Sequence, residues 1–162
     1  MRKISVSLFL LLITVSACVD DSSHLTVPYA PVRFRIDLNG PDYQLKTPLS
    51  FLTFSEKDMR LNTDRFGFAG LLIVSDATGN TIYAYDLCCP YEESREIKVI
   101  PGNEGEAVCP SCGSVFVTMF GLSDNNGMRG LGSVKSGPAT DPLQSYIVRA
   151  VPYQSGSYNI MN

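Results

Sequence analysis

The chain has 162 residues, which is enough for one domain of ordinary size and hardly for two. Hydrophobic residues make up 44% and charged residues 18% of the chain, so it is neither a disordered tail nor a multi-span membrane protein. Thirteen basic residues against sixteen acidic ones give a net charge of −3, which argues against nucleic-acid binding, because that requires a dense basic face. The single histidine is His24, which excludes any site that needs two imidazoles from this chain.

The N-terminus predicts a signal peptide rather than part of the fold. Arg2 and Lys3 precede an apolar run at 4–15, which is too short to span a bilayer comfortably. The next residues complete the sequence VSAC, which resembles the lipobox of bacterial lipoproteins, with Cys18 as the residue that carries diacylglycerol. An ordinary secretory signal with a chance cysteine is the alternative. We therefore expect a signal peptide at 1–17.

The resemblance to lipoproteins implies that 18–25 is a lipid anchor and tether, and that the lipid on Cys18 attaches the protein to a membrane of the cell envelope. The acids Asp20 and Asp21 resemble the surface-export signal of some Bacteroidetes lipoproteins, so the location is either periplasmic or on the surface of the outer membrane. Cleavage leaves eleven basic residues against sixteen acidic ones, a net charge of −5. Outside the cytoplasm free thiols tend to oxidise, so each remaining cysteine is expected to be a ligand, in a disulfide, or buried.

The rest of the chain, 26–162, is predicted to form one all-β domain. A strand is expected at 32–38, where apolar and polar residues alternate. The continuous apolar run at 69–74 is expected to be buried on both faces, and turn residues join it to 81–86 as a hairpin. Gly, Asn, Ser and Pro are frequent at 123–142, which predicts a long loop. The further short strands are expected at 49–54, 98–100, 106–108, 114–120, 146–151 and 158–161, the last two as a hairpin.

The chemistry that the sequence offers lies in two cysteine segments. The first, DLCCPYE, contains Cys88 and Cys89, and the second, CPSCGSVF, contains Cys109 and Cys112. Two thiolates separated by two residues can bind one metal ion, and Gly113 accepts the positive φ that follows such a turn. A metal site needs further ligands, so a metal knuckle, a local disulfide and a pair of buried thiols all remain open for the second segment.

Together these segments resemble the two cluster-binding loops of the Rieske iron–sulfur family, specifically the ferredoxin-like Rieske lipoproteins of Bacteroidetes. The family's first loop is Cys-x-His, which Cys89 and Tyr91 match in position. Its second loop is Cys-Pro-x-His-Gly-Ser-x-Phe, which Cys109 and Cys112 match in position. The clear resemblance covers about 69–151. It implies an antiparallel β sandwich with a small two-loop cluster-binding subdomain.

A third segment is similar to the Gly-Pro-Ala…Pro-Leu…Tyr stretch that covers the cluster in this family. The resemblance implies that Gly137, Pro138 and Ala139 form a lid over the cysteines. We expect Gly113 and Gly137 to take backbone conformations that a side chain would hinder.

Two ligand positions depart from the family pattern. A Rieske cluster uses two thiolates on one iron and two imidazoles on the other. Here Tyr91 and Cys112 stand at the imidazole positions, so a [2Fe–2S] cluster of the two-histidine type is excluded by residue type. Ser111 stands where many family members have an additional cysteine, so the usual disulfide between the loops cannot form in the usual way.

Three states of the site remain open. The first is a [2Fe–2S] cluster on Cys89, Cys109 and Cys112, with Cys88 or Tyr91 as the fourth ligand. The second is zinc on the same thiols, and the third has no metal and disulfides between the loops. Because Cys88 and Cys89 are neighbours, their side chains would point opposite ways in a strand, and both can bind one centre only at a sharp turn.

The expected function is that of a ferredoxin-type electron carrier, or a degenerate relative of one, that is anchored by lipid in the envelope and has a redox or protein partner there. The alternative is a non-redox binding or scaffold module whose facing loops are held by a disulfide or zinc. The sequence has no glycine-rich phosphate loop, no Ser–His–Asp set and no Cys–His pair, so we expect no enzymatic activity. The net charge of −3 predicts no nucleic-acid partner.

Overall fold

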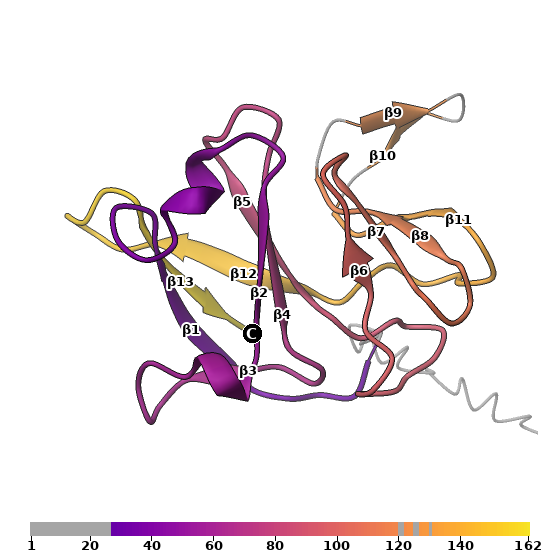
Figure 1. Cartoon of the computed structure of the whole chain (residues 1–162), viewed down its shortest axis with the longest axis horizontal. Coiled ribbons are helices and arrows are strands. Elements are labelled where there is room, and N and C mark those ends of the chain that lie inside the picture. The colour runs from indigo at the N-terminus through magenta and orange to yellow at the C-terminus, as the bar shows by residue number, and fades with distance from the viewer. Residues whose placement is uncertain (1–26, 120–121, 125–126, 130) are drawn as a thin grey trace, which may run out of the picture.

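The computed structural model describes residues 27–119, 122–124, 127–129 and 131–162 (Figure 1). The predicted signal peptide at 1–17, the anchor and tether at 18–25 and Phe120 at the end of a predicted strand lie outside the described residues. Within the described ranges, no helix has the length and apolar character needed to cross a membrane.

The described part of the chain is all-β, as predicted. Its helical content is limited to two short 3₁₀ helices, η1 (Tyr43–Lys46) and η2 (Glu56–Asp58). Seven antiparallel strands form a large sheet in the order β2-β4-β5-β12-β13-β1-β3. Their bounds are β1 (Val32–Asp37), β2 (Phe51–Phe54), β3 (Arg65–Phe66), β4 (Leu71–Ser75), β5 (Ile82–Asp86), β12 (Ser145–Ala150) and β13 (Ser157–Met161).

The large sheet curves until its two edge strands nearly meet. Phe54 on edge strand β2 and Phe66 on edge strand β3 both pack on Phe34 of β1, with ring centroids 4.7 and 5.0 Å apart. These rings belong to an apolar core inside the curved sheet, and alternate residues of β1 point into that core, as their sequence pattern predicts. All five residues of β4 are buried, so the apolar run at 69–74 is covered on both faces, as expected.

Two smaller sheets complete the fold. A four-stranded sheet has the order β11-β8-β7-β6, and β9 pairs with β10 in a separate two-stranded hairpin. Figure 1 shows the four-stranded sheet beside the large one, with the β9–β10 hairpin beyond it. The bounds are β6 (Ile100–Pro101), β7 (Glu106–Val108), β8 (Val115–Val117), β9 (Leu122–Asp124), β10 (Gly127–Arg129) and β11 (Val134–Ser136).

The prediction of one long loop at 123–142 was wrong, because this stretch contains most of β9 and all of β10 and β11. Each of these strands has three residues, which is too short for an apolar–polar alternation to distinguish it from a loop. The two predicted hairpins are confirmed, since β4 pairs with β5 and β12 pairs with β13, both antiparallel.

A second core lies between the outer face of the large sheet and the four-stranded sheet. Leu72 and Tyr85 of the large sheet pack there with Ala107 and Phe116 of the small one. The Tyr85 hydroxyl donates a hydrogen bond of 2.8 Å to the carbonyl of Thr118, which ties the two sheets together. The same core contains three of the cysteines, so the cysteine loops lie at the boundary between the sheets.

The chain leaves the large sheet at the end of β5 and returns to it at β12, which lies directly beside β5. Ser145 pairs with Tyr85 across these two strands, and the Asp86 N–H donates to the carbonyl of Gln144 at 2.8 Å. The four-stranded sheet and both cysteine loops lie between these two points of the sequence.

Candidate metal centre

Three cysteine thiols from two separate loops converge at one point. Cys89 follows β5, whereas Cys109 and Cys112 lie in the turn between β7 and β8. Their three Sγ atoms lie within 4.8 Å of one another, and those of Cys89 and Cys112 are 3.8 Å apart. Cys89 and Cys109 are buried, while Cys112 is partly exposed. The two loops therefore face each other, and their thiols could hold a metal ion.

The first loop turns sharply just after Cys89. The N–H groups of Glu92 and Glu93 both donate to the Cys89 carbonyl, at 3.1 and 3.0 Å. Burial raises the pKa of the Cys89 thiol to about 12, against backbone hydrogen bonds from Tyr91 and Glu92 that lower it. Without a metal, Cys89 is therefore a thiol at neutral pH.

The second loop closes on itself through its backbone. The Gly113 N–H donates to the Cys109 carbonyl at 3.0 Å, and the Cys109 N–H donates to the Ser114 carbonyl at 2.8 Å. Gly113 has a φ of 73°, the left-handed conformation that was expected at this position. This turn brings Cys112 back toward Cys109.

Ser114 connects the second loop to the segment predicted to be the lid. Its Oγ lies 3.1 Å from the Cys112 sulfur and accepts a hydrogen bond of 3.0 Å from the Ala139 N–H. Burial raises the pKa of Cys112, but the hydroxyl and N–H of Ser114, together with the two neighbouring thiols, lower it below its ordinary value. The site thus pairs a thiol of lowered pKa, Cys112, with a thiol of raised pKa, Cys89.

The lid segment lies against the second loop. Gly137 has a φ of 101°, as expected, and a Cβ at this position would lie 2.4 Å from the Cα of Ser114. Ala139 is buried in the same apolar core as Cys89 and Cys109, whereas Pro138 is exposed. Ala139 therefore packs in the core that contains these cysteines, and the role of the segment as a lid stays a prediction.

Cys88 and Tyr91, the two residues predicted as alternative fourth ligands, differ from the three thiols in their surroundings. Cys88 is buried and outside the group, because its Sγ faces the carbonyls of Cys89 and Ser94 at 3.4 and 3.5 Å. Burial, together with the negative charge of Asp86 and Glu93, raises its pKa to about 12. The Tyr91 side chain is 56% exposed. The structure therefore brings together Cys89, Cys109 and Cys112 but not Cys88.

A buried carboxylate that the sequence reading missed fixes the start of the first loop. Asp86 is completely buried, and its Oδ1 accepts the N–H groups of Ala69 and Cys88 at 3.0 and 2.8 Å. Its Oδ2 accepts the Phe68 N–H at 2.6 Å and the Tyr146 hydroxyl at 2.7 Å. Its position in the sequence could have revealed it. An acidic residue at the end of a buried strand, just before a cysteine pair, needs hydrogen-bond donors to compensate for its burial.

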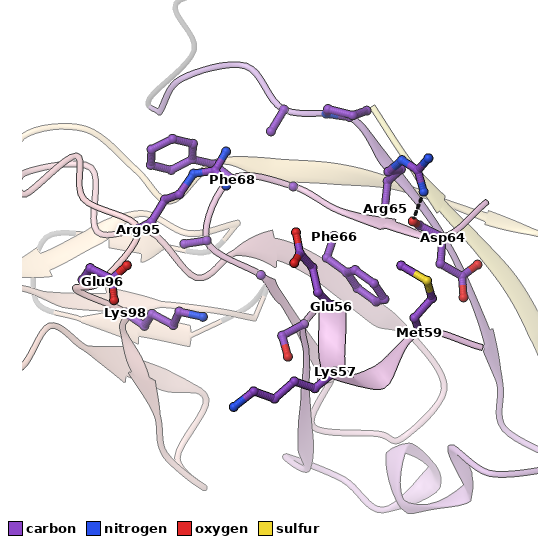
Figure 2. A pocket seen from close by; sticks show the side chains of 16 residues that line it. Glu56, Lys57, Met59, Asp64, Arg65, Phe66, Phe68, Arg95, Glu96 and Lys98 are labelled. Carbon is purple, nitrogen blue, oxygen red and sulfur yellow. Dashed lines mark hydrogen bonds between the residues drawn. The ribbon is translucent and has the colours of Figure 1, made fainter. Parts of the chain in front are cut away.

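The structure also contains a pocket of about 780 Å³ that no sequence motif indicated (Figure 2). It lies between η2, β3 and the segment that follows the first cysteine loop, and Figure 2 shows Lys57 and Lys98 on different walls of it. The guanidinium of Arg95 lies 4.6 Å from the centroid of the Phe68 ring at its margin. None of the cysteines lines this pocket, so it is separate from the three-thiol group.

The donor set decides which metals fit. Three thiolates suit zinc and iron–sulfur centres. A two-histidine cluster does not fit, because the sequence has a single histidine, His24. The chain therefore offers soft sulfur ligands from both loops.

Comparison with known proteins adds no relative, since no family model, no curated protein and no solved structure matches the chain. The chemistry of the site is therefore inferred from its own residues.

Proposed function

We propose that the chain is a lipid-anchored protein of the cell envelope that carries electrons at a metal–thiolate centre on Cys89, Cys109 and Cys112. The observation that carries this proposal is the convergence of three thiols from two facing loops within 4.8 Å. In an oxidising compartment, unligated thiols this close together would tend to form disulfides, and a bound metal would hold them as thiolates instead.

The burial of the site suits electron transfer. Cys89 and Cys109 are buried with Ala139 in the core between the sheets, whereas Cys112 is partly exposed. A bound iron centre would supply one-electron redox chemistry at this place. Two ligands of that centre would be shielded from water, and the third, Cys112, would lie where the surface of a partner protein can approach it.

The Rieske-like architecture is part of the proposal. A curved β sheet, a smaller sheet that carries two cysteine loops, and a Gly-Pro-Ala segment against the second loop agree with the resemblance in the sequence. Because thiolate replaces imidazole at Cys112, the centre is more negative than that of a two-histidine cluster. Its reduction potential is therefore lower.

One distance favours a second candidate, a zinc site that holds the loops of a non-redox scaffold. Zinc–sulfur bonds of about 2.3 Å in a tetrahedron place two sulfur atoms about 3.8 Å apart. The separation of the Cys89 and Cys112 sulfur atoms equals this value, at 3.8 Å. In a cluster of the Rieske arrangement these two residues would instead bind different irons.

Anaerobic purification of the full chain in detergent tests both candidates. An electron carrier is brown, absorbs visible light and contains iron and acid-labile sulfide, whereas the scaffold is colourless and contains one zinc per chain. Cys109→Ser should abolish metal binding, and the matched control Cys88→Ser should retain it, because Cys88 lies outside the thiol group. Metal-free protein with a Cys89–Cys112 disulfide would refute both candidates.

The lipid anchor has its own test. Cys18→Ser should remove the lipid and release the protein from the membrane fraction, as measured by fatty-acid labelling and fractionation. Persistent labelling of this variant would show that Cys18 is not the lipidated residue.

A further inference from the structure

The pocket in Figure 2 combines a buried apolar part with an exposed charged part. Phe66, Ala69 and Gly70 are buried and Phe68 is half-buried, and we call these four residues the floor. The exposed charged side chains belong to η2, to β3 and to the segment that follows the first cysteine loop, and we call them the rim. The volume of about 780 Å³ lies in the range of pockets that hold small organic ligands.

Two lysines of the rim have no acidic partner. Within the part of the chain that the structure describes, neither Lys57 nor Lys98 forms an ion pair or a side-chain hydrogen bond. Figure 2 shows the two side chains extending from different walls, with their ammonium groups directed into the space between the walls. Like charges that share one pocket repel each other, and an anion between them relieves that repulsion.

Arg95 adds a third cation whose donors are available to a ligand. Its guanidinium lies 4.6 Å from the centroid of the Phe68 ring, which holds it at the margin of the pocket. Contact with a ring face uses none of the five N–H donors of the group, and among the described residues none of these donors has an acceptor. A guanidinium can bind a carboxylate through two parallel hydrogen bonds.

The acidic side chains of the pocket limit the charge of the anion. Four basic side chains against the three acidic ones, Glu56, Asp64 and Glu96, leave a net charge of +1. The Asp64 carboxylate is buried and accepts two backbone N–H groups at 2.9 and 2.8 Å, and the Arg65 guanidinium donates to two backbone carbonyls. Glu56 and Glu96 stay in the rim, where they would repel a second negative charge. The pocket therefore suits a carboxylate better than a doubly charged phosphate.

We infer that this pocket binds a small organic acid, whose carboxylate lies among Lys57, Arg95 and Lys98 and whose apolar body lies on the floor. The inference adds a ligand site to the proposed function and does not depend on the metal centre, because none of the described cysteines lines the pocket.

The experiment titrates the full chain in detergent with naphthoate and follows the backbone amide signals by NMR. Signals of 55–57, 66–70 and 95–98 should shift. Naphthoate should bind about tenfold more tightly than naphthalenemethanol, which has the same rings without the charge. It should also bind at least about tenfold more tightly than acetate, which has the charge without the rings. Lys98→Gln and Arg95→Gln should each weaken naphthoate binding about tenfold, since each removes a charge-assisted hydrogen bond.

The matched control is Arg149→Gln, which removes the same charge from an exposed position outside the pocket and should change the affinity by less than about twofold. Equal binding of naphthoate and naphthalenemethanol would overturn the inference, and so would an equal loss of affinity in Arg149→Gln or tighter binding of inorganic phosphate. Cys109→Ser should bind naphthoate like the unaltered chain. Failure of the pocket to bind naphthoate is therefore measured separately from failure of the metal centre.

Discussion

The large sheet and the region of the cysteine loops are stabilised in different ways. The large sheet has strands of up to six residues around an apolar core. Arg60 forms a bidentate ion pair with the buried Asp42, and its guanidinium lies over the Phe34 ring. The strands of the four-stranded sheet have only two or three residues. Its loops are fixed by single polar groups, namely Ser114 in the second loop and, at the start of the first loop, Asp86, which is the last residue of β5 in the large sheet.

This difference indicates that many apolar contacts share the stabilisation of the large sheet, whereas a few polar groups stabilise the region of the cysteine loops. Removal of one apolar contact from the large sheet leaves many others, whereas removal of one acceptor beside the cysteines leaves several buried donors without partners. We therefore expect that single substitutions near the cysteines lower the free energy of unfolding by more than the few atoms they remove would suggest.

The largest effect is expected from Asp86→Ala. Four donors lose their acceptor in this variant, and the free energy of unfolding should fall by about 4 kcal/mol, since one buried unsatisfied group costs roughly 1–3 kcal/mol. Urea denaturation of the full chain measures the change. The control Tyr146→Phe removes one of the four bonds and should cost about 1 kcal/mol. Equal costs for the two variants would show that stability is not concentrated at Asp86.

A smaller effect is expected from Gly137→Ala, for which Gly113→Ala is the matched control. Both glycines have a positive φ, which costs an alanine about 1–2 kcal/mol. Only at Gly137 would the added Cβ also meet backbone, that of Ser114, whereas no atom lies within 4 Å of the Cβ position at Gly113. Gly137→Ala should therefore be the more destabilising by at least about 1 kcal/mol in the same assay. A larger loss of stability in Gly113→Ala than in Gly137→Ala would mean that Gly137 does not pack closely against the backbone of Ser114.

Tyr85→Phe tests the connection between the two regions. The variant removes the hydrogen bond to Thr118 and leaves a buried carbonyl without that donor, at a cost of about 1 kcal/mol. Hydrogen exchange should increase at 115–118 more than in β1. A uniform increase over both regions would show that they unfold as one unit.

The smallest perturbation is a change of pH in the metal-free protein. Because the pKa of Cys112 is lowered and that of Cys89 is raised to about 12, the Cys112 thiolate forms at the lower pH. Alkylation followed by mass spectrometry should therefore modify Cys112 at a lower pH than Cys89, which reacts only as the pH approaches 12. Parallel modification of both cysteines at each pH would contradict the asymmetry of the site.

The sequence predicted those parts of the molecule that depend on local pattern. The apolar run of β4 and the β4–β5 and β12–β13 hairpins followed from periodicity and turn residues. The absence of Cys88 from the group formed by Cys89, Cys109 and Cys112 agrees with the expectation that two neighbouring cysteines do not readily bind one centre. The facing of the loops was predicted only from the family resemblance, because spacing alone left the second segment open.

Other features depend on contacts that are distant in sequence. Asp86 resembles any surface acid until the fold surrounds it with donors from three separate segments. The pocket in Figure 2 combines segments before β4 with one after β5, and no motif marks either of them. The strands β9 to β11 were missed because each is short and rich in turn-forming residues.

The adjacency of β5 and β12 gives the cysteine region the topology of an insertion. Since Asp86 and Gln144 are hydrogen-bonded neighbours, a short turn could replace everything between them without changing the order of the seven strands. Such a deletion would also remove the entropy cost of closing a long loop. It would, however, uncover Leu72 and Val74 on the outer face of β4, which pack against the inserted segment. The insertion therefore serves the large sheet as its cover, and a shortened chain would expose an apolar surface prone to aggregation.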